Sequence, residues 1–267
     1  MEQISQNTVE HARERKIIGN QNTSLLKIIA MVAMIIDHLG AVFFAGQAEF
    51  RVIGRMAFPL YAWCMVIGCV KTRSMPRYIL RTFVMALICQ PLYMLALGYQ
   101  WQDLNILFLL TLALLAIWGI QAHKGYSHIW GPLLCYLAFT FLNIDGDWLA
   151  LSFVIILYLL RNQRRGLIIG YLLSAIFWGT TSEELVMLFG LRLPIWDWPS
   201  LGQMIAPFLR VQSMMWLALP LILWPMESRW RMPRWLSYSI YPLHLVLIIL
   251  IRLCVGTPLA ELIQVFG

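Results

Sequence analysis

Long apolar runs alternate with short polar segments along almost the whole chain. Because an α-helix rises about 1.5 Å per residue, about 20 apolar residues are needed to cross a bilayer. The runs that meet or approach this length lie at residues 25–46, 52–70, 78–98, 104–120, 128–143, 148–160, 166–180, 203–224 and 236–255. The pattern predicts an all-α, polytopic membrane protein with about nine transmembrane helices, of which the sixth and seventh are short enough to lower that count.

The basic residues indicate how these helices are oriented, since cytoplasmic loops are enriched in lysine and arginine. With the N-terminus inside, fifteen of the twenty basic residues fall in inner segments, namely Arg13, Arg15, Lys16, Lys27, Lys71, Arg73, Arg77, Arg81, Lys124, Arg161, Arg164, Arg165, Arg229, Arg231 and Arg234. Removing any middle helix would reverse every later loop and destroy this asymmetry. We therefore predict a cytoplasmic N-terminus and a C-terminus outside.

One membrane domain is expected at residues 25–255, between a cytoplasmic polar tail at residues 1–24 and an outer tail at residues 256–267. The first apolar run is too long for a signal peptide and has no Ala-x-Ala exit, so we expect it to remain as an anchor. The Trp-containing stretch at 181–202 is predicted to be an amphipathic outer loop with its indole rings at the membrane interface.

Composition agrees with a lipid environment. Hydrophobic residues make up 60% of the 267 residues and charged residues 12%, with a mean hydropathy of +0.72, which no soluble domain of this size needs for its core. The net charge of +7 does not indicate nucleic-acid binding, because the basic residues form short clusters between apolar runs. The five cysteines lie inside apolar runs without a Cys-x-x-Cys pair and are interpreted as small hydrophobic residues.

A few polar side chains fall inside the predicted spans, where an ionisable group costs about 2.5–3.5 kcal/mol on insertion. They are Asp37, His38, Arg51, Arg55, Gln90, Asn105, Tyr241 and His244. The helical rise places His38 and His244 on either side of the membrane midplane. Arg55 reaches a depth near His38, where Asp37 can neutralise it. The sequence therefore predicts a polar cavity that these residues share.

Two plainer interpretations stay open: His244 alone could be an inter-helix hydrogen-bonding residue, and Asp37 with Arg55 could form only a structural ion pair. The functional interpretation makes His38 a general base, because imidazole titrates near neutral pH and a nearby acid favours its charged form. No metal site is predicted, since two histidines without further Cys or Glu ligands form a weak zinc site. Proton relays in transporters also use Asp and His within helices.

Four blocks of sequence together resemble the TraX family, conjugative-transfer membrane proteins associated with N-terminal acetylation of F-type pilin. The blocks are LLKIIAMVAMIIDHLGAVF, IGRMAFPLYAWCMVIG, LNILFLLTLALL and YSIYPLHLVLIIL, and the resemblance extends from about residue 25 to 255. Its most specific parts are Asp37-His38, Gly54-Arg55-x-Ala57-Phe58-Pro59 and Asn105-Ile106-Leu107-Phe108. The first-helix histidine and the late Tyr238, Tyr241 and His244 also look like the wider acyltransferase-3 group of membrane enzymes.

The resemblance implies a bacterial inner-membrane acetyltransferase that takes an acetyl group from acetyl-CoA and passes it to a pilin or another envelope acceptor. Asp37 and His38 would be catalytic, with His38 as the general base. Arg55 and Asn105 would stabilise the oxyanion or hold the donor.

The same resemblance implies that Tyr241 and His244 line the donor path from the inside. Lys71, Arg73 and Arg77 could hold the phosphates of CoA, although a plain positive-inside signal explains these residues as well.

Other function classes remain as alternatives. The acyltransferase-3 likeness also fits an O-acyltransferase for an envelope glycan or lipid. A non-catalytic pilus assembly factor or a transporter is the third class. Transporters commonly contain paired repeats with Gly- or Pro-broken helices at matching positions, and no such repeat is evident here.

Overall fold

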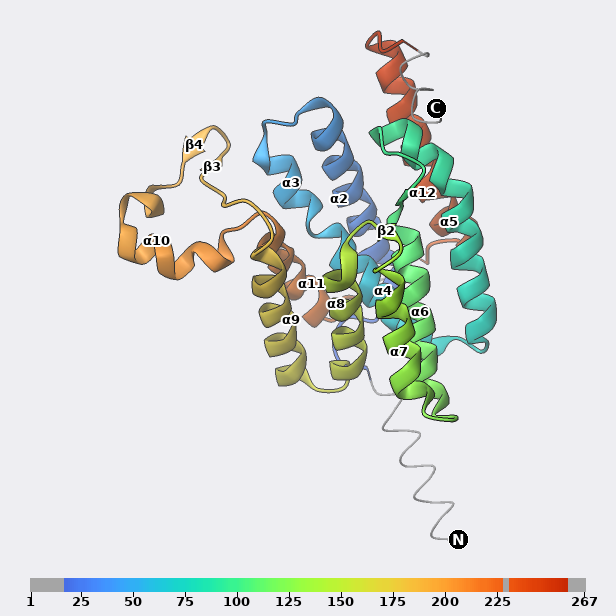
Figure 1. Ribbon diagram of the computed structural model, residues 1–267. Helices are drawn as coiled ribbons and strands as arrows, with labels where there is room; N and C mark the ends of the chain where they lie inside the picture. Colours follow the sequence, from blue (N-terminus) through green and yellow to red (C-terminus); the bar gives the residue numbers. More distant parts are fainter. Residues whose placement is uncertain (1–16, 228–230, 259–267) are drawn as a thin grey trace.

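The computed structural model describes residues 17–227 and 231–258, so most of the two predicted tails lies outside the described residues. The described chain is mostly helical, and its longer helices pack side by side (Figure 1). The α-helices are α2 (Thr23–Phe43), α3 (Ala48–Gly54), α4 (Ala57–Lys71), α5 (Met75–Leu97), α6 (Ile106–Ala122), α7 (Ser127–Ala138), α8 (Asp147–Leu160), α9 (Arg164–Gly179), α10 (Pro199–Ile205), α11 (Leu219–Leu223) and α12 (Arg234–Cys254).

Short strands and 3-10 helices connect the bundle. Strands β1 (Asp103–Leu104) and β2 (Asn143–Ile144) pair in parallel, and β3 (Met187–Leu188) and β4 (Leu191–Arg192) form an antiparallel hairpin. The 3-10 helices are η1 (Pro194–Asp197), η2 (Ala206–Phe208) and η3 (Gln212–Ala218).

Three helical segments are long and apolar enough to cross a membrane: Thr23–Phe43, Ala48–Lys71 and Met75–Leu97. Their length and composition indicate a membrane protein. Shorter apolar helices lie at Ile106–Ala122, Asp147–Leu160, Gln212–Leu223 and Ser239–Cys254. The count of nine spans and the orientation of the termini remain predictions.

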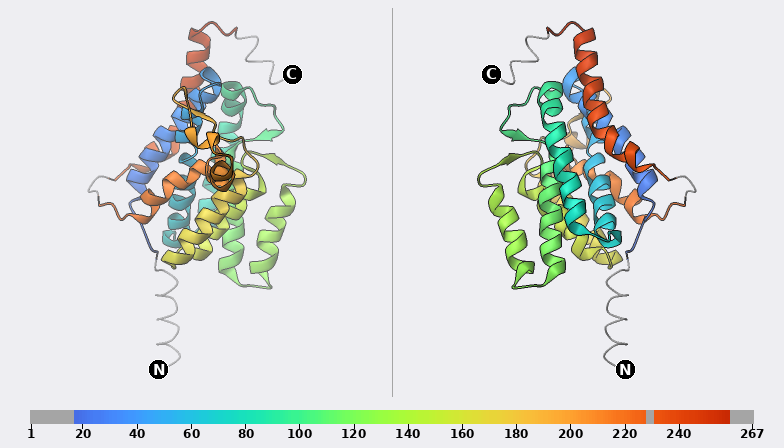
Figure 2. Two further views of the ribbon diagram at one scale, coloured as in Figure 1. Left: turned by 90° about the vertical axis from the view of Figure 1, so that its left-hand side faces the viewer. Right: turned by 90° about the vertical axis from the view of Figure 1, so that its right-hand side faces the viewer.

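Apolar side chains cover much of the outside of the bundle, as expected where lipid is the solvent. The exposed ones include Leu80, Val84, Leu87 and Ile88 on α5, Ile129, Leu133, Leu134 and Leu137 on α7, and Ile169, Leu173 and Phe177 on α9. The centre is occupied by α4, whose Trp63 is fully buried and donates its indole N–H to the Asn20 carbonyl over 2.8 Å. Figure 2 shows α2 and α12 crossing the same side of the bundle.

The predicted eighth span at 203–224 is wrong as a continuous helix. The chain there passes through the end of α10, then η2, η3 and α11. Pro207 and Pro220 lie in this stretch, and proline has no N–H to donate to a helical hydrogen bond. The apolar run is present, but it forms several short helices instead of one long helix.

Candidate functional site

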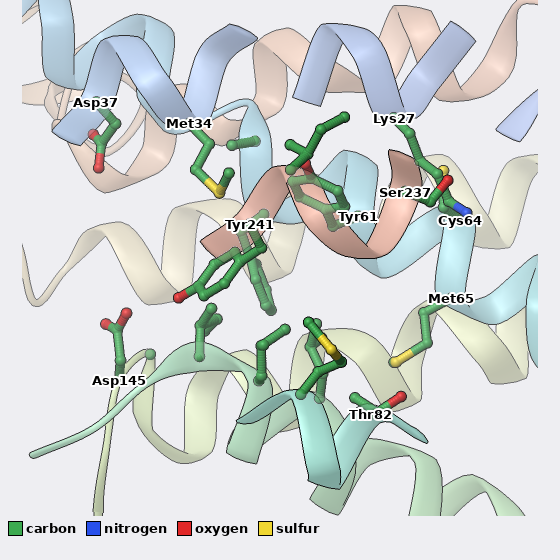
Figure 3. A pocket seen from close by; sticks show the side chains of 18 of the residues that line it. Lys27, Met34, Asp37, Tyr61, Cys64, Met65, Thr82, Asp145, Ser237 and Tyr241 are labelled. Carbon is green, nitrogen blue, oxygen red and sulfur yellow. The ribbon is translucent and has the colours of Figure 1, made fainter. Parts of the chain in front are cut away.

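A cavity of about 1680 Å³ lies between α2, α4, α5 and α12. Ligand pockets commonly enclose about 300–1,000 Å³, so this cavity has room for an extended ligand. Figure 3 shows Asp37 and Asp145 at one end of it and Lys27 at the other, with the Tyr241 ring between them. The two ends therefore differ in charge. We call them the acidic end and the basic end.

At the acidic end, Asp37 on α2 holds two arginines that come from the adjoining α3 segment. Arg51 Nη1 donates to Asp37 Oδ2 over 2.9 Å, and Arg55 Nη2 lies 3.4 Å from Asp37 Oδ1. Arg55 Nη1 also donates to the amide oxygen of Gln212 over 2.6 Å. The predicted pairing of Asp37 with Arg55 is present, and Arg51 adds a second cation. Two guanidinium groups share one carboxylate, so the cluster keeps an excess positive charge.

His38 follows Asp37 along α2 but points elsewhere, because successive residues of an α-helix are rotated by about 100°. Its Nδ1 lies 2.9 Å from Nε2 of His244 on α12, and the ring centroids are 5.0 Å apart. The Asp37 oxygens bond to arginines instead. The hydrogen-bond partner of His38 is therefore His244 and not its sequence neighbour Asp37.

His244 was expected to line the donor path, but it does not line the cavity. It is buried behind His38, with only 3% of its surface exposed. Tyr241 does line the cavity, and the edge of its ring packs on His244 with centroids 5.1 Å apart. The side chain of Tyr238 lies outside the described part of the chain.

Asn105 also lies away from the cavity. It is fully buried at the start of α6, where its side-chain oxygen accepts from Leu107 N over 3.0 Å. Its amide donates to the Ala86 carbonyl over 2.9 Å and to Gln90 Oε1 over 2.8 Å. These bonds make Asn105 the cap of α6 and use its amide, while its expected role at an oxyanion stays a prediction.

Asp145 faces Asp37 across the acidic end (Figure 3). A smaller hollow of about 330 Å³ adjoins the cavity here and is lined by two further acids, Asp103 and Asp147. The Asp145 carboxylate is open to the cavity, yet the surrounding protein atoms desolvate it and raise its pKa above the usual value. The Arg55 guanidinium opposes this rise in the Asp145 pKa.

The basic end collects side chains from the start of α2, the end of α4 and the start of α5. They are Lys27, Lys71, Arg73, Arg77 and Arg81. Among the described residues that line the cavity, the acids are Asp37 and Asp145 at the other end. A hollow lined by one sign of charge attracts ligands of the opposite sign. The basic end therefore suits an anionic group.

The model of the TraX protein family matches residues 22–252 of the chain. The chain belongs to the TraX family. Curated relatives include the probable fimbrial assembly protein FimC, serogroup H1, of Dichelobacter nodosus, which is 30% identical over 56% of this chain and 67% of its own length. Protein TraX of Escherichia coli is 30% identical over 41% of this chain and 47% of its own length.

Protein TraX of Escherichia coli strain K12 is 26% identical, with the same coverage of 41% and 47%. The matched segments thus span about half the length of each TraX protein. No solved structure matches the chain.

Sequence reasoning on this TraX-family chain missed three cavity residues. Asp145 lies in a loop, where acidic residues are common and do not indicate a site. Gln212 lies in the predicted eighth span, which does not form a continuous helix. Lys27 counted only as a topology signal, although its place inside an apolar run could have marked it as a site residue.

Within the described residues, no group of three or more His, Cys, Asp or Glu side chains could hold a metal ion.

Proposed function

We propose that this protein is an inner-membrane acetyltransferase that transfers an acetyl group from acetyl-CoA to the N-terminal amine of a pilin subunit. The observation that carries the proposal is one cavity that joins a basic end to a histidine and an ionic cluster buried among membrane helices. Membership of the TraX family and the fimbrial assembly name of one relative support a pilus-related substrate.

The basic end fits the donor. Coenzyme A carries phosphates, which lysine and arginine bind through charge and hydrogen bonds. Lys27 is half-buried beside the cavity wall, whereas Arg73 and Arg77 are exposed at its rim. Phosphates held at this rim would leave the rest of the cavity for the extended pantetheine arm and its thioester.

The acidic end fits the acceptor. An α-amino group has a pKa of about 7.7–8.0 and is mostly a cation at neutral pH. Asp145, with Asp103 and Asp147 in the adjoining hollow, would attract that cation from the side opposite the donor. Asp37 would balance one of the two charges of Arg51 and Arg55, and Asp145 would face the other.

His38, which lines the cavity beside Asp37, would act as the base. The bound ammonium first releases one proton to solvent, since only the neutral amine attacks. His38 takes a second proton from the attacking amine, whose nitrogen bonds to the acetyl carbonyl carbon. The carbon–sulfur bond then breaks, and the proton held on His38 passes to the departing CoA thiolate. Arg51, Arg55 and the Tyr241 hydroxyl line the cavity and would donate to the oxyanion.

Intact mass of pilin produced with and without this protein tests the reaction. We expect a gain of one acetyl group only when the protein is present, and a loss of that gain with His38→Ala at equal membrane abundance. Pilin of unchanged mass in the presence of abundant wild-type protein would refute the proposal.

Binding of acetyl-CoA at the basic end has a separate test. Arg77→Gln should raise KM for acetyl-CoA several-fold, because it removes one cation from the basic end. Arg164→Gln is the matched control, since Arg164 is exposed at the start of α9 and does not line the cavity. Equal KM values for the two variants would argue against donor binding at this end.

A non-catalytic pilus assembly factor is the second candidate, favoured by the name of the Dichelobacter nodosus relative, a probable fimbrial assembly protein. This candidate predicts that pilus number falls without the protein while pilin mass stays unchanged. It also predicts that His38→Ala restores assembly as well as the wild-type protein does.

A further inference from the structure

The contact between His38 and His244 is unusual because two imidazoles meet without a carboxylate between them. We infer that His244 is a positioning residue, which fixes the tautomer of His38 and directs its basic nitrogen into the cavity. This inference rests on the proposed function, because it specifies how the proposed base is prepared.

The tautomers follow from one backbone contact. Nδ1 of His244 lies 3.2 Å from the Ile240 carbonyl oxygen, one turn earlier on α12. A carbonyl oxygen only accepts hydrogen bonds, so His244 Nδ1 carries the proton. In the neutral ring, His244 Nε2 is then the acceptor. His38 Nδ1, 2.9 Å away, must donate to it.

The remaining nitrogen of His38 is thereby left without a proton. Within the described residues, His38 Nε2 has no hydrogen-bond partner. It is also not fully buried, because the buried polar atoms that lack a partner do not include it. His38 lines the cavity, while His244 lies behind it. The bare nitrogen is thus the one that an acceptor amine in the cavity can reach.

The packing holds both rings in this arrangement. The His38 and His244 planes are nearly parallel, at 21°, and the Tyr241 ring meets His244 edge-on at 73°. His244 therefore has the Tyr241 ring against it and hydrogen bonds at both nitrogens. A ring held in this way cannot rotate to offer a different atom to His38.

The arrangement also stabilises the charge that catalysis would create. When His38 Nε2 takes a proton, the bond from Nδ1–H to His244 becomes charge-assisted and stronger. Asp37 does not supply this help, because its oxygens already bind Arg51 and Arg55. The charged groups near His38 are thus Asp37 and its two arginines, and the neutral His244 stabilises the imidazolium by accepting its hydrogen bond.

Two substitutions separate positioning from mere packing. His244→Leu removes the acceptor, and we expect kcat to fall about 10²-fold, at the lower limit of general-base effects, with KM for acetyl-CoA unchanged. His244→Gln keeps an oxygen that can accept from His38 Nδ1, and its kcat should stay within about tenfold of wild type. Equal loss in both variants, or no loss in His244→Leu, would overturn the inference.

Nitrogen-15 NMR of histidine-labelled full-length protein in nanodiscs gives a readout that does not need activity. Two rings should show the Nδ1–H tautomer, assigned by their loss in His38→Ala and His244→Leu, with His128→Gln as the control. An Nε2–H tautomer on His38 would overturn the inference even if pilin is acetylated. The expected tautomers with unmodified pilin would instead refute the proposed function alone.

Discussion

Gly54 determines how closely α3 approaches α2 beside the ionic cluster. A Cβ atom built on Gly54 would overlap the side chain of Asp37, both at its Cβ and at its carboxylate. Absence of a side chain at this position therefore lets Asp37 reach Arg51 and Arg55. Gly54 and Arg55, which belong to one of the blocks that resemble the TraX family, thus act together. Gly54 allows the close approach of α2, and Arg55 forms the ion pair with Asp37 that this approach permits.

Gly54→Ala should displace Asp37 and weaken both ion pairs. Overpacking of this kind typically costs about 1–3 kcal/mol. We expect less protein in the membrane and, for the fraction that folds, lower acetylation of pilin. Gly46→Ala is the matched control, because nothing lies within 4 Å of a Cβ at Gly46. Equal accumulation and equal activity of the two variants would contradict this account of Gly54.

At the residue scale, the sequence predicted the ion pair between Asp37 and Arg55 but not the contact between His38 and His244. Asp37 and Arg55 could be paired in advance, because ionisable groups at a similar membrane depth require compensation. The contact between His38 and His244 could not, since depth does not reveal how far each helix is rotated. Asn105 was ambiguous for a related reason: a polar residue at the start of a helix serves equally well as a cap or as a site residue.

At the scale of single elements, the start of α6 depends on one buried amide. Asn105 caps α6 and ties it to α5 through Gln90 and the Ala86 carbonyl. Asn105→Ala removes the cap, which alone costs about 0.5–2 kcal/mol, and leaves buried partners unsatisfied. We expect a lower thermal unfolding midpoint in detergent, with acetylation per folded molecule unchanged.

The control for this prediction is Asn143→Ala, because Asn143 is exposed and its bond to Asp103 lies at the surface. An unchanged unfolding midpoint in Asn105→Ala, together with a selective loss of activity, would instead place Asn105 in the site.

A second element stands apart from the bundle. Residues 186–208, which we call the arm, leave the bundle near the end of α9 and project sideways (Figure 1). The backbone closes the base of the arm, where Leu185 N donates to the Leu209 carbonyl over 2.7 Å. Exposed apolar side chains cover the arm, including Phe189, Leu191, Trp198 and Met204. Exposed apolar side chains thus occur in the predicted outer loop at 181–202, while its amphipathic character and its contact with the membrane interface are still predictions.

Spin labels can test where the arm lies. A label at Met204→Cys should be more accessible to oxygen, which concentrates in lipid, than to a water-soluble nickel reagent, because an exposed apolar surface favours the membrane interface. The measurement uses Cys254→Ser, since Cys254 is an exposed cysteine. Lys124→Cys, on the exposed α6–α7 turn, should show the opposite preference. Equal nickel accessibility at both positions would place the arm in water.

The helices themselves were largely predictable, because apolar runs of this length have few alternatives to a helix in lipid. The predicted run at 104–120 became α6 (Ile106–Ala122), and the run at 236–255 became α12 (Arg234–Cys254). The arm and the broken stretch after it were not predictable in detail. Their apolar content matches that of a span, and their shape depends on prolines and on packing against α3 and α9.

For the whole molecule, the proposed function depends on orientation. The turns before α5, α7 and α9 lie at one end of the bundle, and the loops after α2 and α5 lie at the other (Figure 1). Most basic residues of these connections fall at the first end, which also holds the basic end of the cavity. A cytoplasmic donor and an outer acceptor can reach the same cavity only if this end faces the cytoplasm.

Reporter fusions along the chain test that orientation. Fusions after residues 74, 124 and 163 should report cytoplasm, because those turns carry lysine or arginine, which the positive-inside rule retains there. Fusions after residues 101, 146 and 190 should report the outside. The fusion at 190 tests the number of spans, because it follows the two short helices α8 and α9 and lies in the arm. If it reports cytoplasm, those helices do not both span and the prediction of nine spans is wrong. A report of cytoplasm at 101 or 146 would instead put the acidic end on the same side as the donor, and acetyl transfer from inside to outside through this cavity would be excluded.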